Sequence, residues 1–171
     1  MKMLDLARDF KFLPQLIVFD LDYTLWPFWC DTHIYPPVYK KQGALYNADG
    51  TQIHIYPDSE SILRCIHAHP GVKLACASRT AEISIAKRLL NLLQWDQLFD
   101  YVEIYPGSKV NHFERLHNLT GIPYNRMMFF DDENRNVTEV RRLGVHSYLV
   151  SRGMSLAAFE SALRQFEANS D

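Results

Sequence analysis

Residues 16–24 read LIVFDLDYT, and much of the architecture can be worked out from this stretch: four apolar residues are followed at once by Asp20, Asp22 and Thr24. A short apolar run of this kind, with Pro14 just before it, is typical of a strand covered on both faces, as in parallel sheets. Four further runs are mostly apolar in the same way, and we expect a strand at each: residues 72–77, 101–105, 127–130 and 147–150.

Segments with helical spacing separate these strands. Apolar residues recur every three or four positions in the stretches 59–69, 81–93, 109–119, 133–143 and 156–167. Strands that alternate with helices through short links form a parallel sheet. We therefore predict an α/β protein of the three-layer, Rossmann-like type, with helices on both faces of a parallel sheet.

Residues 26–56 interrupt this alternation. They are rich in aromatic and turn-forming residues, and residues 53–56 (IHIY) alternate like a strand. We predict a short hairpin-like flap or an irregular excursion, because the segment is shorter than the roughly 50 residues that a domain needs. Residues 1–171 then form a single domain. Neither the flap nor the short link between Tyr105 and Lys109 has room for a folded cap domain over the site.

The aromatic residues of the flap allow two interpretations. They can pack the flap onto the sheet, which is the commoner role, or one or two of them can line a pocket for the leaving group of a substrate. In the second case Trp26 and Phe28 are the candidates, because they lie nearest to Asp22 in the sequence. The residues concerned are Trp26, Phe28, Trp29, Tyr35 and Tyr39.

Composition excludes several classes of partner. Lys plus Arg number 18 and Asp plus Glu 20, which gives a net charge of −2 and a pI near 6.4. This balance argues against nucleic-acid or acidic-membrane binding, and no apolar run approaches the ~20 residues that span a bilayer. Three cysteines without CxxC spacing indicate a reducing compartment. We expect a cytoplasmic protein, with the nucleus as a second compartment, and a monomer.

Polar residues follow four of the predicted strands and should converge, because the carboxyl ends of parallel strands share the edge where ligands bind. Clustered carboxylates are suitable ligands for Mg²⁺, and a lysine and a hydroxyl can hold phosphate oxygens. A carboxylate nucleophile, with a second carboxyl as acid and base, can hydrolyse a phosphate ester in two steps. The set is Asp20, Asp22, Ser78, Arg79, Lys109, Asp131 and Asp132.

Single members of this set also have ordinary structural interpretations. Ser78 can cap a helix that begins near Thr80, and Arg79 can be surface charge. Two features favour a functional role instead. Asp131 and Asp132 are adjacent like charges that need a nearby cation. Lys109 stands in the first turn of a predicted helix, where the positive end of the helix disfavours a cation.

At these positions the sequence resembles the haloacid dehalogenase-like phosphatases. Residues 20–24 (DLDYT) match the DxDxT motif of that superfamily, and Ser78, Lys109 and the pair 131–132 match its other motifs in order. The resemblance runs from about residue 16 to 150 and implies the capless form of that fold. The matching stretches are residues 19–27 (FDLDYTLWP), 77–80 (ASRT), 104–109 (IYPGSK) and 129–133 (FFDDE).

The resemblance also implies roles for the individual residues. Asp20 would be the nucleophile and a Mg²⁺ ligand. Asp22 would be the general acid and base, and its backbone carbonyl would bind the metal. Asp132 would be a direct metal ligand, and Asp131 would act on the metal through water. The residues that bind the substrate would be Ser78, Arg79 and Lys109.

We therefore expect a Mg²⁺-dependent phosphomonoester phosphatase that works through an aspartyl-phosphate. Without a cap, its open site suits phosphotyrosine-like, protein-borne or sugar phosphates. The alternative is a receiver-like signalling module that keeps a persistent phospho-aspartate. Asp22 argues against that alternative, because an acid and base two residues from the nucleophile promotes turnover. A dehalogenase is disfavoured, since a halide leaving group needs neither Mg²⁺ nor that acid.

Overall fold

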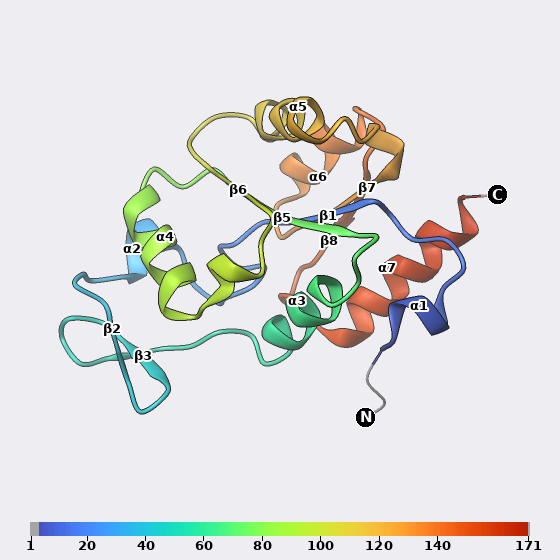
Figure 1. Ribbon diagram of the computed structural model, residues 1–171. Coiled ribbons are helices and arrows are strands. Elements are labelled where there is room, and N and C mark those ends of the chain that lie inside the picture. The colour runs from blue at the N-terminus through green and yellow to red at the C-terminus, as the bar shows by residue number, and fades with distance from the viewer. Residues whose placement is uncertain (1–3, 171) are drawn as a thin grey trace.

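A five-stranded parallel sheet forms the middle of the molecule. The computed structural model, which describes residues 4–170, places its strands in the order β6–β5–β1–β7–β8 (Figure 1). The central strand β1 is fully buried, as its apolar sequence predicts. The strands are β1 (Leu16–Phe19), β5 (Lys73–Ser78), β6 (Tyr101–Ile104), β7 (Met127–Asp131) and β8 (His146–Leu149).

Helices cover both faces of this sheet, and each face has its own apolar core. Ile17 and Phe19 point into one core, whereas Leu16 and Val18 point into the other. The first core is covered by α1 (Leu6–Asp9), α3 (Ser59–His67), α4 (Ile83–Leu92) and α7 (Leu156–Ala168), and the second by α5 (Lys109–Thr120) and α6 (Asn134–Arg141). The predicted three-layer α/β fold is therefore confirmed.

The strands and helices predicted outside the flap are present, with ends displaced by at most two residues. Four elements of a single turn were not predicted: α1, α2 (Cys30–His33) and the 3₁₀ turns η1 (Trp95–Gln97) and η2 (Tyr124–Arg126). An element of one turn is too short to show a hydrophobic period. The α1 helix depends instead on a cap, because the Asp5 side chain accepts a hydrogen bond from the Arg8 backbone N–H at 3.1 Å.

The flap is a small antiparallel sheet that projects from the main body (Figure 1). Residues 53–56 were predicted to be a strand, which is wrong beyond Ile53. The chain has already turned back by Tyr56, whose N–H donates to the carbonyl of Leu25 at 3.2 Å. Within residues 4–170 there is no folded cap domain. The flap contains α2 (Cys30–His33), β2 (Tyr39–Lys41), β3 (Ala44–Tyr46) and β4 (Gln52–Ile53).

The strand order fixes where a ligand site can form. After β1 the chain builds β5 and β6 on one side of it, and then crosses to build β7 and β8 on the other side. The adjacent strands β1 and β7 therefore mark the point where the direction of winding reverses, which is where parallel sheets bind ligands. Asp20 directly follows β1, and Asp131 ends β7.

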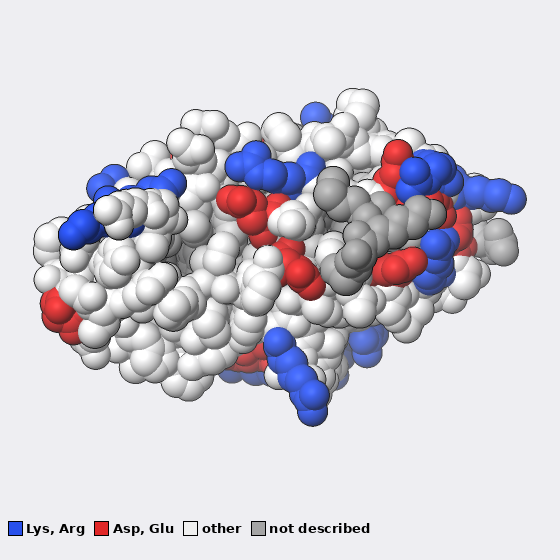
Figure 2. Space-filling view, turned by 90° about the horizontal axis from the view of Figure 1, so that it is seen from below, with Lys and Arg blue, Asp and Glu red and all other residues white. Residues whose placement is uncertain are grey.

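Charged residues of both signs are spread over the face shown in Figure 2, where separate blue groups lie among white residues and red groups lie beside several of them. Such a face lacks the continuous basic surface that attracts a nucleic-acid backbone. In the described part of the chain, no helix is both long and apolar enough to cross a membrane.

The loop before α7 packs closely against the segment that leaves β1. The Met154 N–H donates to the carbonyl of Thr24 at 2.9 Å. Gly153 has a φ of +74°, and a Cβ atom built there would lie 2.3 Å from the ring of Tyr56. Only a glycine fits this position. Any other residue would be strained at this φ, and its Cβ atom would overlap the Tyr56 ring.

We expect Gly153→Ala to lower the free energy of unfolding by more than about 2 kcal/mol. Left-handed backbone costs a non-glycine residue about 1–2 kcal/mol, and overpacking adds about 1–3 kcal/mol. Urea unfolding followed by tryptophan fluorescence measures the change. Gly121→Ala is the matched control, since Gly121 has a φ of +70° and open space around it. Equal losses in the two variants would contradict the packing argument.

Candidate active site

The segment after β1 turns sharply and brings Asp20 and Thr24 together. The Leu25 N–H donates to the carbonyl of Leu21 at 2.9 Å, and Tyr23 has a φ of +57°, which a bulky residue rarely adopts. The buried Thr24 hydroxyl donates to Oδ2 of Asp20 at 3.1 Å. The turn thus fixes one oxygen of the Asp20 carboxylate.

Asp22 is held by the flap. The Trp26 indole N–H donates to its Oδ1 at 2.8 Å, and the Cys30 backbone N–H donates to its Oδ2 at 3.2 Å. Burial raises the pKa of Asp22 above its usual value, although both hydrogen bonds oppose this shift. Trp26 and Cys30 are themselves fully buried, so the direction of the Asp22 carboxyl is set by packed groups.

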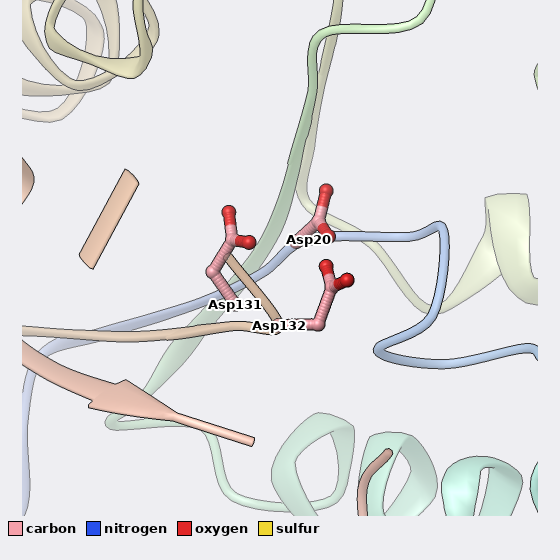
Figure 3. Close-up of side chains that lie close together, drawn as sticks. All are labelled: Asp20, Asp131 and Asp132. Carbon is pink, nitrogen blue, oxygen red and sulfur yellow. The ribbon is translucent and has the colours of Figure 1, made fainter. Parts of the chain in front are cut away.

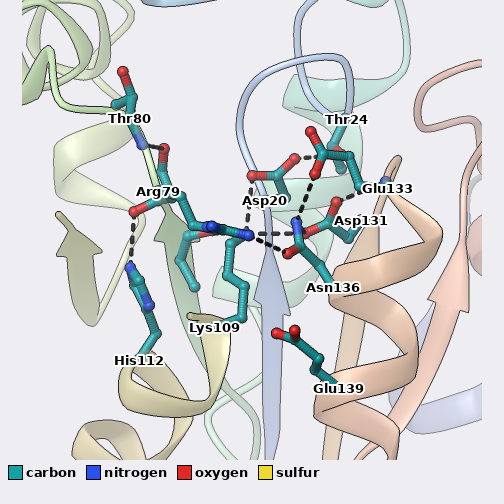
Figure 4. Close-up of polar contacts among 12 residues, drawn as sticks. Asp20, Thr24, Arg79, Thr80, Lys109, His112, Asp131, Glu133, Asn136 and Glu139 are labelled. Carbon is teal, nitrogen blue, oxygen red and sulfur yellow. Dashed lines mark hydrogen bonds and ion pairs between the residues drawn. The ribbon is translucent and has the colours of Figure 1, made fainter. Parts of the chain in front are cut away.

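Lys109 lies at the centre of the site, with its side chain 1 % exposed. Its Nζ donates to Oδ1 of Asp20 at 3.0 Å, to Oδ2 of Asp131 at 2.9 Å and to the carbonyl of Ala77 at 2.6 Å (Figure 4). Burial by itself would lower the pKa of Lys109. The negative charges of Asp20 and Asp131 outweigh this effect, so the pKa is raised above its usual value. Lys109 is therefore a buried, fully hydrogen-bonded cation.

Asn136 connects the carboxylates of Asp131 and Glu133 to Arg79. Its Nδ2 donates to Oδ2 of Asp131 at 3.1 Å and to Oε2 of Glu133 at 3.4 Å, while its Oδ1 accepts from Nη1 of Arg79 at 3.0 Å. The Glu133 N–H donates to the other Asp131 oxygen at 2.9 Å. Asp131 is thus fully buried and bonded at both oxygens.

Three carboxylates form a cluster that fits a divalent cation. Asp20, Asp131 and Asp132 each place one oxygen within 4.8 Å of the others (Figure 3). Burial, a hydrogen bond to Asp20 and the neighbouring negative charges raise the pKa of Asp132 to about 9. A single buried lysine leaves the cluster with excess negative charge. Carboxylate oxygens are ligands that Mg²⁺ prefers, so the donor set fits the predicted ion.

Ser78 and the loop before α5 are tied together by His112. The Nε2 atom of this buried residue lies 2.8 Å from the carbonyl oxygen of Ser78 and 2.9 Å from that of Tyr105. The Ser78 hydroxyl accepts from the Thr80 N–H at 3.3 Å. Because α4 begins only at Ile83, Ser78 closes a turn and does not cap that helix.

A pocket of about 450 Å³ lies over these groups. Six of the seven residues predicted for the site line it together, whereas Asp131 lies beneath, against Lys109 and Asn136. The roles that the resemblance implies for them stay predictions. The six are Asp20, Asp22, Ser78, Arg79, Lys109 and Asp132.

Comparison with known proteins identifies the family. The family model described as Acid Phosphatase matches residues 12–169. The chain belongs to this family. Membership makes it a hydrolase of phosphate esters and agrees with the resemblance seen in the four motifs.

Two relatives narrow the assignment. Magnesium-dependent phosphatase 1 from Homo sapiens is 47% identical over 155 residues, which cover 90% of this chain and 88% of the relative. The FDLDYTLWP, ASRT, IYPGSK and FFDDE stretches already resemble that protein, and the resemblance is confirmed. A HAD-like hydrolase superfamily protein from Schizosaccharomyces pombe is 44% identical over 152 residues, which cover 82% and 87% of the two chains.

Solved structures show the same fold at low identity. A haloacid dehalogenase-like family hydrolase from Xanthomonas campestris aligns with a TM-score of 0.65 at 12% identity, covering 91% of this chain and 93% of that one. The L-2-haloacid dehalogenase from Xanthobacter autotrophicus aligns with a TM-score of 0.58 at 14% identity, covering 92% and 88%. The HAD-like fold class is thereby confirmed.

The sequence did not point to several residues that line the pocket. Asn136 falls within the predicted helical stretch 133–143, and nothing in the sequence singled out its side chain. Trp26 and Phe28 were the flap aromatics suggested for the pocket, but both are buried away from it and stack on each other at 5.2 Å. Trp29, another of the flap aromatics considered for this role, lines the pocket instead. Thr80 and Glu133 fall in the matched stretches 77–80 and 129–133 but had no predicted role, and the sequence did not single out the lining residues Asp31, Thr32, Arg135 and Asn136.

We expect Lys109→Met to lower the free energy of unfolding of the metal-free protein by about 3–5 kcal/mol at pH 8. The substitution leaves Asp20 and Asp131 as buried charges without their cation. The loss becomes smaller as pH falls, because burial raises the pKa of Asp131 and a protonated carboxyl needs no cation. Denaturant titrations at pH 8 and pH 5 measure the difference. Lys87→Met, on the exposed side of α4, should change stability by less than about 0.5 kcal/mol.

We expect Mg²⁺ affinity to rise with pH. In the metal-free protein Asp132 holds a proton at neutral pH, since its pKa is raised to about 9. A ligating carboxylate must lose this proton before it binds the metal. Below about pH 9, the Kd for Mg²⁺ should therefore fall roughly tenfold for each unit by which the pH rises. Calorimetry in two buffers of different ionisation enthalpy counts the released protons. Affinity that is constant from about pH 6 to 8 would contradict this reading of the cluster.

Proposed function

We propose that this protein is a Mg²⁺-dependent phosphomonoester phosphatase that works through an aspartyl-phosphate on Asp20. The observation that carries the proposal is the buried ion-pair network of Asp20, Lys109 and Asp131, which lies beside Asp132 and beneath a pocket that also contains Asp22. The name of the human relative, magnesium-dependent phosphatase 1, supports the choice of metal.

In the first step, a carboxylate oxygen of Asp20 attacks the phosphorus atom. Thr24 and Lys109 fix the direction of that carboxylate. The bond between phosphorus and the ester oxygen breaks, and Asp22 gives its proton to the departing oxygen. Burial raises the pKa of Asp22, which favours the protonated form that this step needs.

In the second step, water attacks the phosphorus of the acyl-phosphate. Asp22, now ionised, takes a proton from this water, and the bond between phosphorus and Asp20 breaks. Inorganic phosphate leaves, and Asp20 returns as a carboxylate. Asp22 is protonated again, so the cycle balances and one residue acts as acid and then as base.

Asp20, Asp132 and the backbone carbonyl of Asp22 would hold Mg²⁺, with Asp131 acting through water. When bound, the ion offsets the repulsion between the Asp20 carboxylate and a phosphate dianion. Asp131 suits its indirect role, because it is fully buried beneath the pocket, whereas Asp20 and Asp132 line it.

Ser78, Arg79 and Lys109 would hold the phosphorylated substrate. The three contacts of the Lys109 ammonium are all with protein oxygens, so a phosphoryl oxygen would have to replace one of them. The small flap supports an open site that accepts phosphotyrosine-like, protein-borne or sugar phosphates. The free cysteines are compatible with the cytoplasm, where we also propose that the chain acts as a single-domain monomer.

Hydrolysis of para-nitrophenyl phosphate tests the proposal. With Mg²⁺ we expect turnover by the wild type, none above background by Asp20→Asn, and a kcat roughly 10²–10⁴-fold lower in Asp22→Asn. A chelator should abolish activity. Asp96→Asn, an exposed carboxylate in η1, is the matched control and should keep wild-type turnover.

Three outcomes would count against the proposal. Comparable activity in Asp20→Asn would contradict the nucleophile. Turnover that does not depend on metal would contradict the metal site. A long-lived phospho-Asp20 with negligible turnover, detected by mass spectrometry, would favour the receiver-like alternative.

A further inference from the structure

Trp29 is an apolar aromatic residue at the edge of an otherwise polar pocket. Among the described residues that line the pocket, it is the single aromatic one, and the others carry charged, hydroxyl or amide groups. It is also 47% exposed, although its flap neighbours Trp26 and Phe28 are buried. A large apolar side chain left half-exposed at a polar pocket gains its stability from something other than burial.

Neighbouring rings hold Trp29 in a defined orientation. Its indole stacks on His33 with the ring centres 5.5 Å apart and the planes 15° from parallel, and it meets Tyr23 edge-on at 5.0 Å. The Trp29 backbone N–H also donates to Nδ1 of His33 at 2.9 Å. A ring fixed in this way loses little conformational freedom when a ligand packs against it.

The position of Trp29 relative to Asp22 indicates which part of a substrate it meets. Trp29 directly precedes Cys30, whose N–H holds the Asp22 carboxyl. Asp22 and Trp29 line the same pocket, while Lys109 lies with Asp20 and Asp131 at the phosphoryl end. Since Asp22 protonates the leaving oxygen in the proposed mechanism, the carbon skeleton attached to that oxygen lies on the side of Trp29.

We propose that Trp29 is the residue that selects the leaving group, by presenting an apolar wall to flat, apolar groups on the ester oxygen. The inference rests on the proposed phosphatase function. Polar sugar groups gain little from such a wall, whereas an aromatic ring gains stacking and buried apolar area. Tyr35 provides a comparison, because it is an exposed aromatic of the same flap that does not line the pocket.

The proposal is tested with two phosphate esters in which a phenyl group in one replaces a methyl group in the other. Benzyl phosphate and ethyl phosphate both release a primary alcohol, so their chemistry is matched. The kcat/KM ratio of benzyl to ethyl phosphate is measured with Mg²⁺ for the wild type and for Trp29→Ala, Trp29→Phe and Tyr35→Ala. We expect the ratio to fall roughly tenfold in Trp29→Ala and less than about threefold in Trp29→Phe. In Tyr35→Ala it should stay at the wild-type value.

The inhibition constant of inorganic phosphate, which lacks a leaving group, should stay within roughly twofold of the wild type in each variant. A ratio that does not change in Trp29→Ala, or equal losses for both esters, would overturn the proposal while leaving the phosphatase function intact. Wild-type protein that hydrolyses neither these esters nor para-nitrophenyl phosphate would instead contradict the proposed function. If Trp29→Ala does not fold, as judged by circular dichroism, Trp29→Gln replaces it with the same expected fall.

Discussion

One buried ammonium group joins three strands of the sheet. Lys109 reaches from the first turn of α5 to Asp20 after β1, to Asp131 at the end of β7 and to the carbonyl of Ala77 in β5. Taking an ammonium out of water is expensive, and the cost is met only when its charge is paired and all its donors are used. Lys109 meets both conditions. The carboxyl ends of the three strands therefore keep a fixed separation, and the catalytic geometry depends on that separation.

The sequence predicted the parts of this arrangement that follow from local patterns. Residues 16–19 are apolar because β1 is buried on both faces, and the acidic residues after β1 and β7 meet because parallel strands end at a common edge. The importance of Lys109 could also be inferred, since a cation in the first turn of a helix is unfavourable without a partner.

The rest depends on contacts between segments that are distant in the sequence. Nothing in the local pattern of residues 133–143 distinguishes Asn136 from an ordinary helix-surface residue, because its role comes from Arg79, which follows the distant strand β5. The flap aromatics were equally ambiguous. Trp26 is buried because Phe28 and Trp95 stack on it, at 5.2 Å and 6.2 Å, and η1, which contains Trp95, was not predicted. This stack sets the direction of Asp22, so the proposed acid is held by the insertion and the nucleophile by the sheet.

The alternation of side chains along β1 has a consequence for how sequences of this fold can diverge. Ile17 and Phe19 belong to one core, and Leu16 and Val18 to the other. Side chains on opposite faces do not touch, so their substitution energies should add independently. Either core can then be repacked while the other is kept, provided that the backbone of β1 stays in place. Residues at the carboxyl ends of the strands have no such freedom, because Lys109 binds groups from β1, β5 and β7 at once. Sequence drift in the two cores and strict constraint at the strand ends are thus two results of the same geometry.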